Sequence, residues 1–178
     1  KLLTDAYAGQ QVVLIENEFG EIGIDGGFMK EAGIQVTEMN SGCICCSGAV
    51  DLQQAVRTIK EQYNPAWLLI EATGVALPSS IRDTLKNAFG IDAATLTIAD
   101  ASRWTRIRRV SPEFSVSQVQ YADIVLLTKI DKISTEAASA VEADVRECSP
   151  NAAVYPVNAL KPIDTGYFED LMDKALEG

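Results

Sequence analysis

Short, uninterrupted runs of apolar residues recur along the chain and constrain its fold more than any other feature. Val12–Ile15 and Ile124–Leu127 contain only valine, leucine and isoleucine. Runs of this kind are typical of strands that are buried on both faces of a parallel sheet. Similar runs stand at 67–70, 94–99 and 152–157, and a weaker one stands at 35–39.

Stretches with the spacing of amphipathic helices separate these predicted strands. They cover residues 49–62, 79–89, 117–121, 135–148 and 166–176, and residues 1–8 are predicted as the end of an earlier helix. Strands that alternate with helices predict an α/β fold whose mostly parallel sheet is covered on both faces. At 178 residues the chain is long enough to bury the core of one domain, which we expect to span residues 1–178.

The composition argues against some kinds of binding partner and some cellular environments. A formal net charge of −10 at pH 7 argues against nucleic acid or an anionic membrane surface as the main partner. No apolar run approaches the roughly 20 residues of a membrane span, and no signal peptide is recognisable. Three of the four cysteines are clustered, unlike a secreted disulfide framework, so we expect a reducing, cytoplasmic environment.

The clustered cysteines Cys43, Cys45 and Cys46 lie within four residues of one another. Thiolates are soft ligands that suit zinc, cobalt, cuprous copper or iron–sulfur chemistry. A structural zinc site takes four ligands, usually as two separated pairs, and the sequence has no histidine to complete such a set. Three ligands in one short loop therefore favour a metal that is bound and then handed over. The alternatives are buried cysteines that act as small apolar residues, or a redox-active thiol pair.

In open α/β sheets, ligands bind beyond the carboxyl ends of the strands, so the residues that follow each strand are candidates for a site. The segment 16–27 holds four carboxylates, among them Glu18 and Asp25, and four glycines. Such carboxylates suit a hard cation such as Mg²⁺, whereas composition alone favours a solvated acidic loop. Glu71 and Gly74 follow the strand at 67–70 and suit a metal–water contact plus a backbone N–H directed at a phosphate, or an ordinary turn.

The segment Thr128-Lys129-Ile130-Asp131 follows the strand at 124–127. An aspartate at this place can accept two hydrogen bonds from the N–H groups on one edge of guanine, and the lysine stem can lie along the base. The alternative is a polar loop that opens a helix, with Asp131 near the N-cap. Asn158 and Ala159 follow the last strand, where backbone groups could touch the same base.

The order of these motifs resembles the CobW family of P-loop GTPases, whose wider group includes the urease and hydrogenase nickel accessory GTPases. The resemblance covers most of the chain. It is carried by Glu16–Asp25 (ENEFGEIGID), Asn40–Cys46 (NSGCICC), Glu71–Pro78 (EATGVALP), Ala99-Asp100-Ala101 and Thr128–Asp131 (TKID). The family has the three-layer P-loop NTPase fold, and its members are GTP-dependent metallochaperones or metal insertases.

The resemblance implies a role for each motif. Cys43, Cys45 and Cys46 would bind the cargo metal. Glu71 and Gly74, the implied catalytic residues, would sense Mg²⁺ and the terminal phosphate. Glu18 to Asp25 would form the first switch, and Lys129 and Asp131 would read guanine.

The implied function is a metallochaperone that binds a soft divalent metal through the CxCC motif and gates its transfer by GTP hydrolysis. The implied ligands are GTP, Mg²⁺ and either Zn²⁺ or Co²⁺, and the implied partner is a client metalloprotein or an enzyme of the cobalamin pathway. A homodimer is left open, because related GTPases dimerise. The alternative is a metal-binding or thiol-redox module that does not hydrolyse nucleotide.

The sequence departs from the family pattern in three places. The Walker A motif GxxGxGK[ST], expected just upstream of Lys1, does not occur. Without that phosphate cradle we expect the chain as written not to hydrolyse GTP efficiently, and we expect the parent protein to carry the loop. Thr128 stands where the family usually has asparagine, a variant shared with signal-recognition-particle GTPases, so we expect Asp131 to keep guanine selectivity. The family's C-terminal domain and histidine-rich stretch are also absent.

Overall fold

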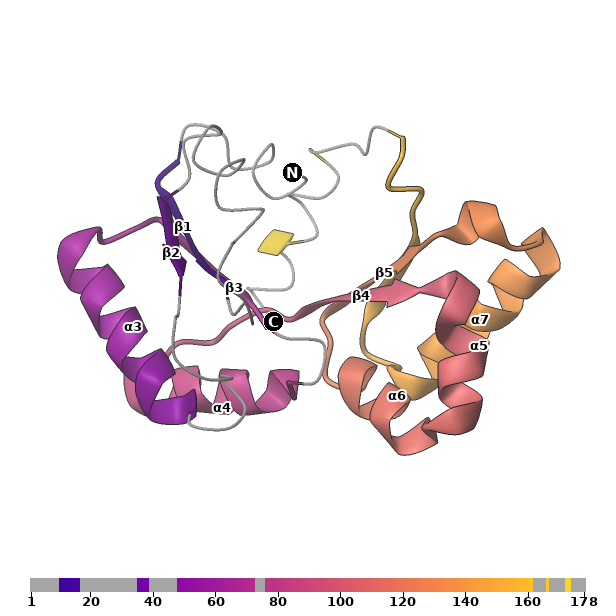
Figure 1. The fold of residues 1–178 in the computed structure, drawn as a ribbon, viewed down its shortest axis with the longest axis horizontal. Coiled ribbons are helices and arrows are strands. Elements are labelled where there is room, and N and C mark those ends of the chain that lie inside the picture. Colours follow the sequence, from indigo (N-terminus) through magenta and orange to yellow (C-terminus); the bar gives the residue numbers. More distant parts are fainter. Residues whose placement is uncertain are drawn as a thin grey trace. The chain divides into compact units, whose positions relative to one another are not determined.

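The computed structural model describes residues 10–16, 35–38, 48–72, 76–161, 166 and 172–173. The described chain divides into two compact units, Lys1–Ile91 and Asp92–Gly178. Each unit contains a three-stranded sheet in which every paired strand is parallel (Figure 1). The predicted α/β class with parallel pairing is therefore confirmed, and the expectation of one domain over residues 1–178 stays a prediction.

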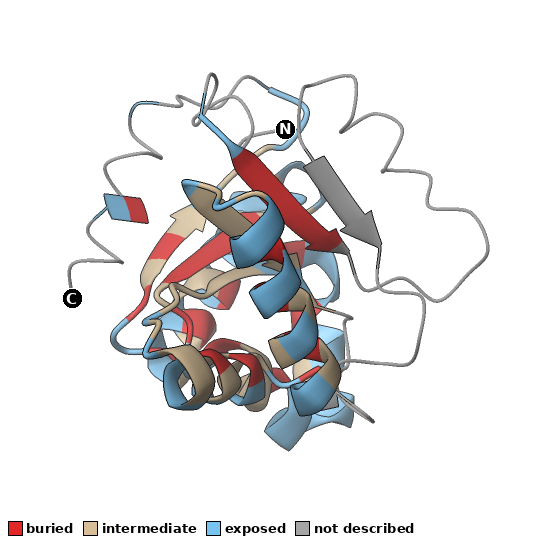
Figure 2. Ribbon diagram, turned by 90° about the vertical axis from the view of Figure 1, so that its left-hand side faces the viewer, coloured by how far each residue is buried: buried red, intermediate tan, exposed pale blue. Residues whose placement is uncertain are grey.

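The first unit is built on β1 (Val12–Glu16), which lies between β2 (Gln35–Glu38) and β3 (Trp67–Glu71). Val12, Val13, Leu14 and Ile15 are all buried, as the apolar run predicts for a central strand (Figure 2).

Two helices accompany this sheet, α3 (Gly48–Gln62) and α4 (Pro78–Phe89). α3 buries Leu52, Val56 and Ile59, whose spacing places them on one helical face. α4 starts with Pro78 in its first turn, where a missing N–H costs nothing. It ends at Gly90, whose φ of 66° is a left-handed conformation that glycine adopts without strain.

The second unit is built on β5 (Ile124–Thr128), which lies between β4 (Leu96–Asp100) and β6 (Ala153–Pro156). Its helices are α5 (Ala101–Val110), α6 (Pro112–Val119) and α7 (Thr135–Cys148), and a 3₁₀ turn, η1, covers Ile130–Lys132. Alternate residues of a strand face the same side of the sheet. Val125 and Leu127 of β5 accordingly share one core cluster with Trp104 of α5 and with Val141 and Val145 of α7.

In the second unit one predicted helix was misplaced and one helix was missed. The sequence predicted a helix at 117–121, whereas α6 begins at Pro112 and ends at Val119, because the proline occupies its first turn. The sequence also gave no sign of α5, which is rich in arginine. α5 forms because Asp100 caps its N-terminus and because Ala101 and Trp104 bury one face of the helix.

The remaining predicted elements agree with the structure to within two residues wherever they are described. Helix α7 covers the predicted residues, and Ser134 accepts a hydrogen bond from the N–H of Ala137 as its N-cap. The predicted helical end at 1–8 lies outside the described residues, as does most of the predicted helix 166–176. No helix among the described residues is long and apolar enough to cross a membrane.

Candidate nucleotide-binding site

The carboxyl end of the first sheet carries a row of acidic residues. The last residues of β2, β1 and β3 are Glu38, Glu16 and Glu71. Glu16 is the register partner of both Glu38 and Glu71, so the three Cα atoms follow one another across the sheet. Glu71 is exposed. Oxygen ligands of this kind suit Mg²⁺, and Glu71 stands at the strand end where the sequence predicted it.

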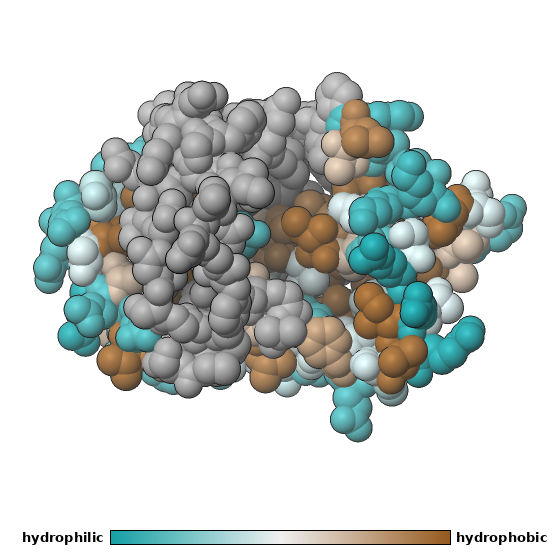
Figure 3. Space-filling view, in the orientation of Figure 1, coloured by the Kyte–Doolittle hydropathy of each residue, from teal (hydrophilic) through white to brown (hydrophobic). Residues whose placement is uncertain are grey.

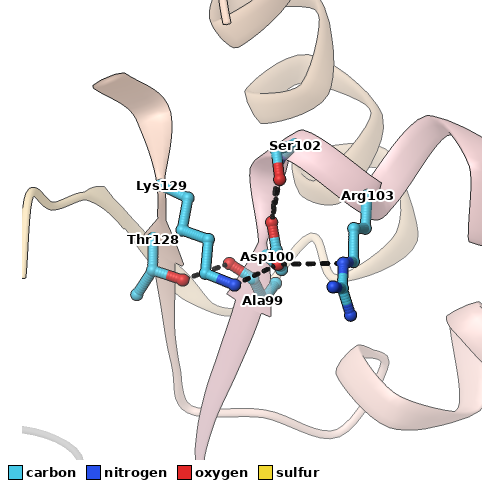
Figure 4. A network of polar contacts seen from close by, with 6 residues as sticks. All are labelled: Ala99, Asp100, Ser102, Arg103, Thr128 and Lys129. Atoms are coloured by element: carbon cyan, nitrogen blue, oxygen red, sulfur yellow. Dashed lines mark hydrogen bonds and ion pairs between the residues drawn. The ribbon is translucent and has the colours of Figure 1, made fainter. Parts of the chain in front are cut away.

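The carboxyl end of the second sheet is tied together by side chains. Asp100 and Thr128 are register partners at the ends of β4 and β5. The Thr128 hydroxyl donates a hydrogen bond of 3.2 Å to the carbonyl oxygen of Ala99 on the neighbouring strand (Figure 4). An asparagine amide can donate in the same way. The threonine therefore keeps a cross-strand bond of a kind that asparagine could also make.

Asp100 is the centre of the polar network at this edge (Figure 4). Its Oδ2 accepts a hydrogen bond of 2.7 Å from Lys129 Nζ, and its Oδ1 accepts bonds from the Ser102 N–H at 3.0 Å and the Ser102 hydroxyl at 2.6 Å. Arg103 Nε stands 3.7 Å from Oδ2. Burial raises the pKa of Asp100, but the hydrogen bonds from Lys129 and Ser102 and the Lys129 charge outweigh it and hold the pKa below its ordinary value. Asp100 is therefore a carboxylate at neutral pH.

Lys129 has an unusual backbone conformation. Its φ of 58° and ψ of 28° place a residue that is not glycine in the left-handed region. The chain turns there into η1, and the carbonyl oxygen of Lys129 accepts a hydrogen bond of 3.1 Å from the Lys132 N–H. This sharp turn directs the chain away from β5 immediately after the strand ends.

Asp131 lies within η1 and is exposed. Lys129, rather than Asp131, occupies the N-cap position of this turn, and it makes no side-chain cap. The Asp131 side chain is 29% exposed, and its carboxylate pairs at 3.4 Å with Lys132 Nζ, whose side chain is 62% exposed. Exposed ion pairs are worth about 0–1 kcal/mol, so this pair leaves Asp131 available to a ligand that offers two N–H groups.

The loop after β6 runs alongside the end of β5. The Val157 N–H donates a hydrogen bond of 2.8 Å to the Leu127 carbonyl oxygen. Asn158, which is half-buried, accepts a bond of 3.0 Å from the Leu160 N–H, and Ala159 is exposed. The loop that carries Asn158 therefore starts beside the end of β5, and a contact of Asn158 with a base stays a prediction.

Several predicted site residues lie outside the described part of the chain. They are Glu18, Asp25, Cys43, Cys45, Cys46 and Gly74. Among the residues that the structure does describe, no group of three or more cysteines, aspartates or glutamates is close enough to hold a metal ion.

Cys148 is the described cysteine, and it packs against the core of the second unit. Burial, together with the nearby Asp144 carboxylate, raises the pKa of its thiol, and Arg108 offsets this only in part. A protonated thiol is a poor metal ligand. Cys148 is therefore a packing residue.

The sequence prediction gave Asp100 no role, although the residue follows the run at 94–99. The rule that selected Glu71 and Lys129, a polar side chain directly after a buried strand, also selects Asp100. Its pairing with Lys129 depends on the register of β4 against β5, which spacing alone does not reveal.

The parallel α/β sheets place the fold with that of solved P-loop GTPase structures. The Zn(II)-bound YjiA GTPase from E. coli superposes with a TM-score of 0.66 at 23% sequence identity, over 93% of this chain and 55% of that one. The sequence also matches the family described as CobW/HypB/UreG, nucleotide-binding domain, over residues 1–156. The chain belongs to this family.

Curated relatives include two bacterial zinc chaperones. The zinc chaperone YeiR of Escherichia coli is 33% identical over 145 residues, which are 79% of this chain and 44% of that protein. The zinc chaperone CobW of Pseudomonas aeruginosa is 28% identical over 193 residues, which cover 88% of this chain and 51% of that protein. The chain thus spans about half the length of the curated relatives it matches.

Proposed function

We propose that this chain is the GTP-binding part of a metallochaperone that takes up a soft divalent metal and releases it under the control of GTP hydrolysis. The observation that carries the proposal is the family match over residues 1–156, which includes the cysteine cluster and the strand-end motifs. The names of YeiR and CobW, both zinc chaperones, favour Zn²⁺ over Co²⁺ as the cargo.

Guanine is read at the carboxyl end of the second sheet. Asp131 accepts hydrogen bonds from the two N–H groups on one edge of the base, and Lys129 lies along its face. Asn158 and Ala159, in the loop beside β5, contact the base through backbone groups. This assignment is supported by the exposure of Asp131 and by the bond from Val157 to Leu127, which places the last loop at the same edge.

The first sheet and its loops bind the phosphates. Glu71 stands at the end of β3 with an exposed carboxylate, the hard oxygen donor that Mg²⁺ prefers. Bound Mg²⁺ would neutralise charge on the phosphates. Gly74 offers a backbone N–H to the terminal phosphate, and Glu18 to Asp25 form the segment that orders when that phosphate is present.

The cargo metal is held by Cys43, Cys45 and Cys46, which lie between the two nucleotide-sensing segments in the sequence. Ordering of those segments by GTP assembles the three thiolates, and hydrolysis releases them. Because thiols must lose a proton to bind metal, affinity falls as the pH drops. A client metalloprotein receives the ion.

Reciprocal binding measurements in the full-length protein test this proposal. Zinc affinity is measured by competition with a chromogenic chelator, with and without a non-hydrolysable GTP analogue. GTP-analogue affinity is then measured with and without zinc. By linkage the two ratios are equal, and we expect each to be about five- to 150-fold.

The cysteine variants separate the proposed site from other thiols. Cys45→Ser is expected to abolish the coupling, whereas Cys148→Ala keeps it, because Cys148 packs in the core. Equal zinc affinity with and without the analogue would overturn the gating. Zinc binding with no nucleotide binding at all would favour the alternative, a metal-binding or thiol-redox module.

A further inference from the structure

The Asp100 carboxylate connects the start of helix α5 with Lys129, the residue that follows β5. One oxygen, Oδ1, caps α5 by accepting from the N–H and the hydroxyl of Ser102. The other, Oδ2, accepts from Lys129 Nζ at 2.7 Å. The Asp100 side chain is 21% exposed and the Lys129 side chain 53% exposed, so a half-buried acceptor holds a more exposed donor.

Lys129 needs such an anchor. Its flexible four-carbon stem loses rotamer freedom when it is held against a base. Its left-handed backbone is sparsely populated for a residue other than glycine, and it persists only where the surroundings enforce it. The bonds of Thr128 to Ala99 and of Lys129 to Asp100 fix the two residues that lead into η1. The loop is therefore organised before any ligand arrives.

We propose that Asp100 is a positioning residue for guanine recognition, which holds the Lys129 ammonium so that the lysine stem is already placed to flank the base. The inference rests on the GTP binding proposed above. Asp100 acts through Lys129 and touches no part of the nucleotide. Anchoring a side chain before binding lowers the entropic cost of binding, and this gain disappears when the anchor is lost.

Asp100→Asn in the full-length protein is the informative substitution. Asparagine caps helices about as well as aspartate, so α5 keeps its N-cap while Lys129 loses its charged partner. We expect the GDP affinity, measured by titration calorimetry, to fall about three- to tenfold. The thermal midpoint serves as a check that the variant is folded.

A matched control is available on α7 in the same unit. Glu142 Oε1 pairs with Arg146 at 2.7 Å, and the two side chains are 30% and 51% exposed, so this ion pair resembles that of Asp100 and Lys129. Glu142→Gln removes the same charge and leaves the strand ends intact. We expect its GDP affinity to equal that of the wild type. An equal loss in both variants would overturn the inference, because it would reflect net charge alone.

A double-mutant cycle separates positioning from general stabilisation. In the Lys129→Met background, Asp100→Asn is expected to change GDP affinity by less than about 1.5-fold, because the residue through which Asp100 acts is absent. A full three- to tenfold loss in that background would overturn the inference, as would tighter GDP binding by Asp100→Asn alone. Failure of the wild type to bind GDP would instead refute the proposed GTP binding itself and the inference with it.

Discussion

The sheet β2-β1-β3 ends in three glutamates, whereas the sheet β4-β5-β6 ends in an aspartate that already has a lysine partner. Glu38, Glu16 and Glu71 occupy neighbouring register positions, and adjacent strands lie only about 4.8 Å apart. At the other sheet, Lys129 and Ser102 bond to Asp100 without any ligand. The first edge therefore has acidic residues at the ends of three strands, whereas the polar side chains of the second edge are already bonded to one another.

The surface of the second unit has both apolar and charged residues. Its exposed apolar side chains include Val110 at 73% and Phe114 at 40%, and α5 contains four arginines. Hydrophobic and hydrophilic residues are interspersed on the face that Figure 3 shows.

The largest expected effect comes from Asp131→Asn, which would break the guanine contact at the second edge. The amide presents a donor where the base also has donors, so we expect GDP affinity without Mg²⁺ to fall by about 100-fold. Titration calorimetry on the full-length protein measures it. Glu71→Gln under the same metal-free conditions should bind GDP as the wild type does. Equal losses of GDP affinity in the two variants would show that the two sheet edges do not bind different parts of the nucleotide.

Glu71→Gln is expected to act only when Mg²⁺ is present. Removing a carboxylate that contacts a metal-bound water costs about 10- to 100-fold in metal affinity or activity. We expect GTP hydrolysis by the full-length protein to require correspondingly more Mg²⁺ and to be slower, as a phosphate-release assay would record. If the Mg²⁺ dependence of hydrolysis were unchanged, the assignment of Glu71 to the phosphate site would be wrong.

Thr128→Val tests whether the second edge is held together as described. Valine keeps the branched shape but loses the hydroxyl that donates to the Ala99 carbonyl oxygen. We expect the free energy of unfolding to fall by about 1 kcal/mol, measured by urea denaturation. Thr128→Ser keeps the hydroxyl donor, so its free energy of unfolding is expected to fall by less. The interpretation would be wrong if serine destabilised the chain as much as valine does.

The smallest expected effect is the pH dependence of folding stability that arises from the Asp100 carboxylate. Because its folded pKa is lowered from 3.8, its ionised form contributes stability above that pH, and the contribution is lost as the pH falls through the folded pKa. We expect a difference below about 1 kcal/mol between the wild type and Asp100→Asn at pH 6. Urea denaturation from pH 6 to pH 3 should show this difference shrinking. A difference that grows in acid would contradict the lowered pKa.

Much of the fold could be predicted from the sequence because buried parallel strands leave a local signature. The run Ile124–Leu127 is buried at every position in the structure. Helix α5 has no such signature in the sequence, because it contains four arginines and buries only a narrow face that includes Trp104. Its start depends on Asp100, and an aspartate after a strand predicts a loop as readily as a cap.

The sequence predicted the strand ends at which the candidate site residues lie, but not the contacts that these residues make. Lys129, Asp131 and Asn158 follow buried strands, which is where ligands of such sheets bind. The bond from Lys129 to Asp100 joins residues 29 positions apart in the chain and depends on strand register. The roles of Cys43, Cys45 and Cys46 stay predictions, since these residues lie outside the described part of the chain.

The backbone of Lys129 narrows the set of amino acids that this position can tolerate. Glycine would adopt a φ of 58° most readily, yet it would bring no cation to the end of the strand. Valine or isoleucine would be doubly unsuitable, since a branched Cβ crowds this conformation and carries no charge. Glycine at this position would therefore keep the turn and lose the cation, whereas valine or isoleucine would keep neither.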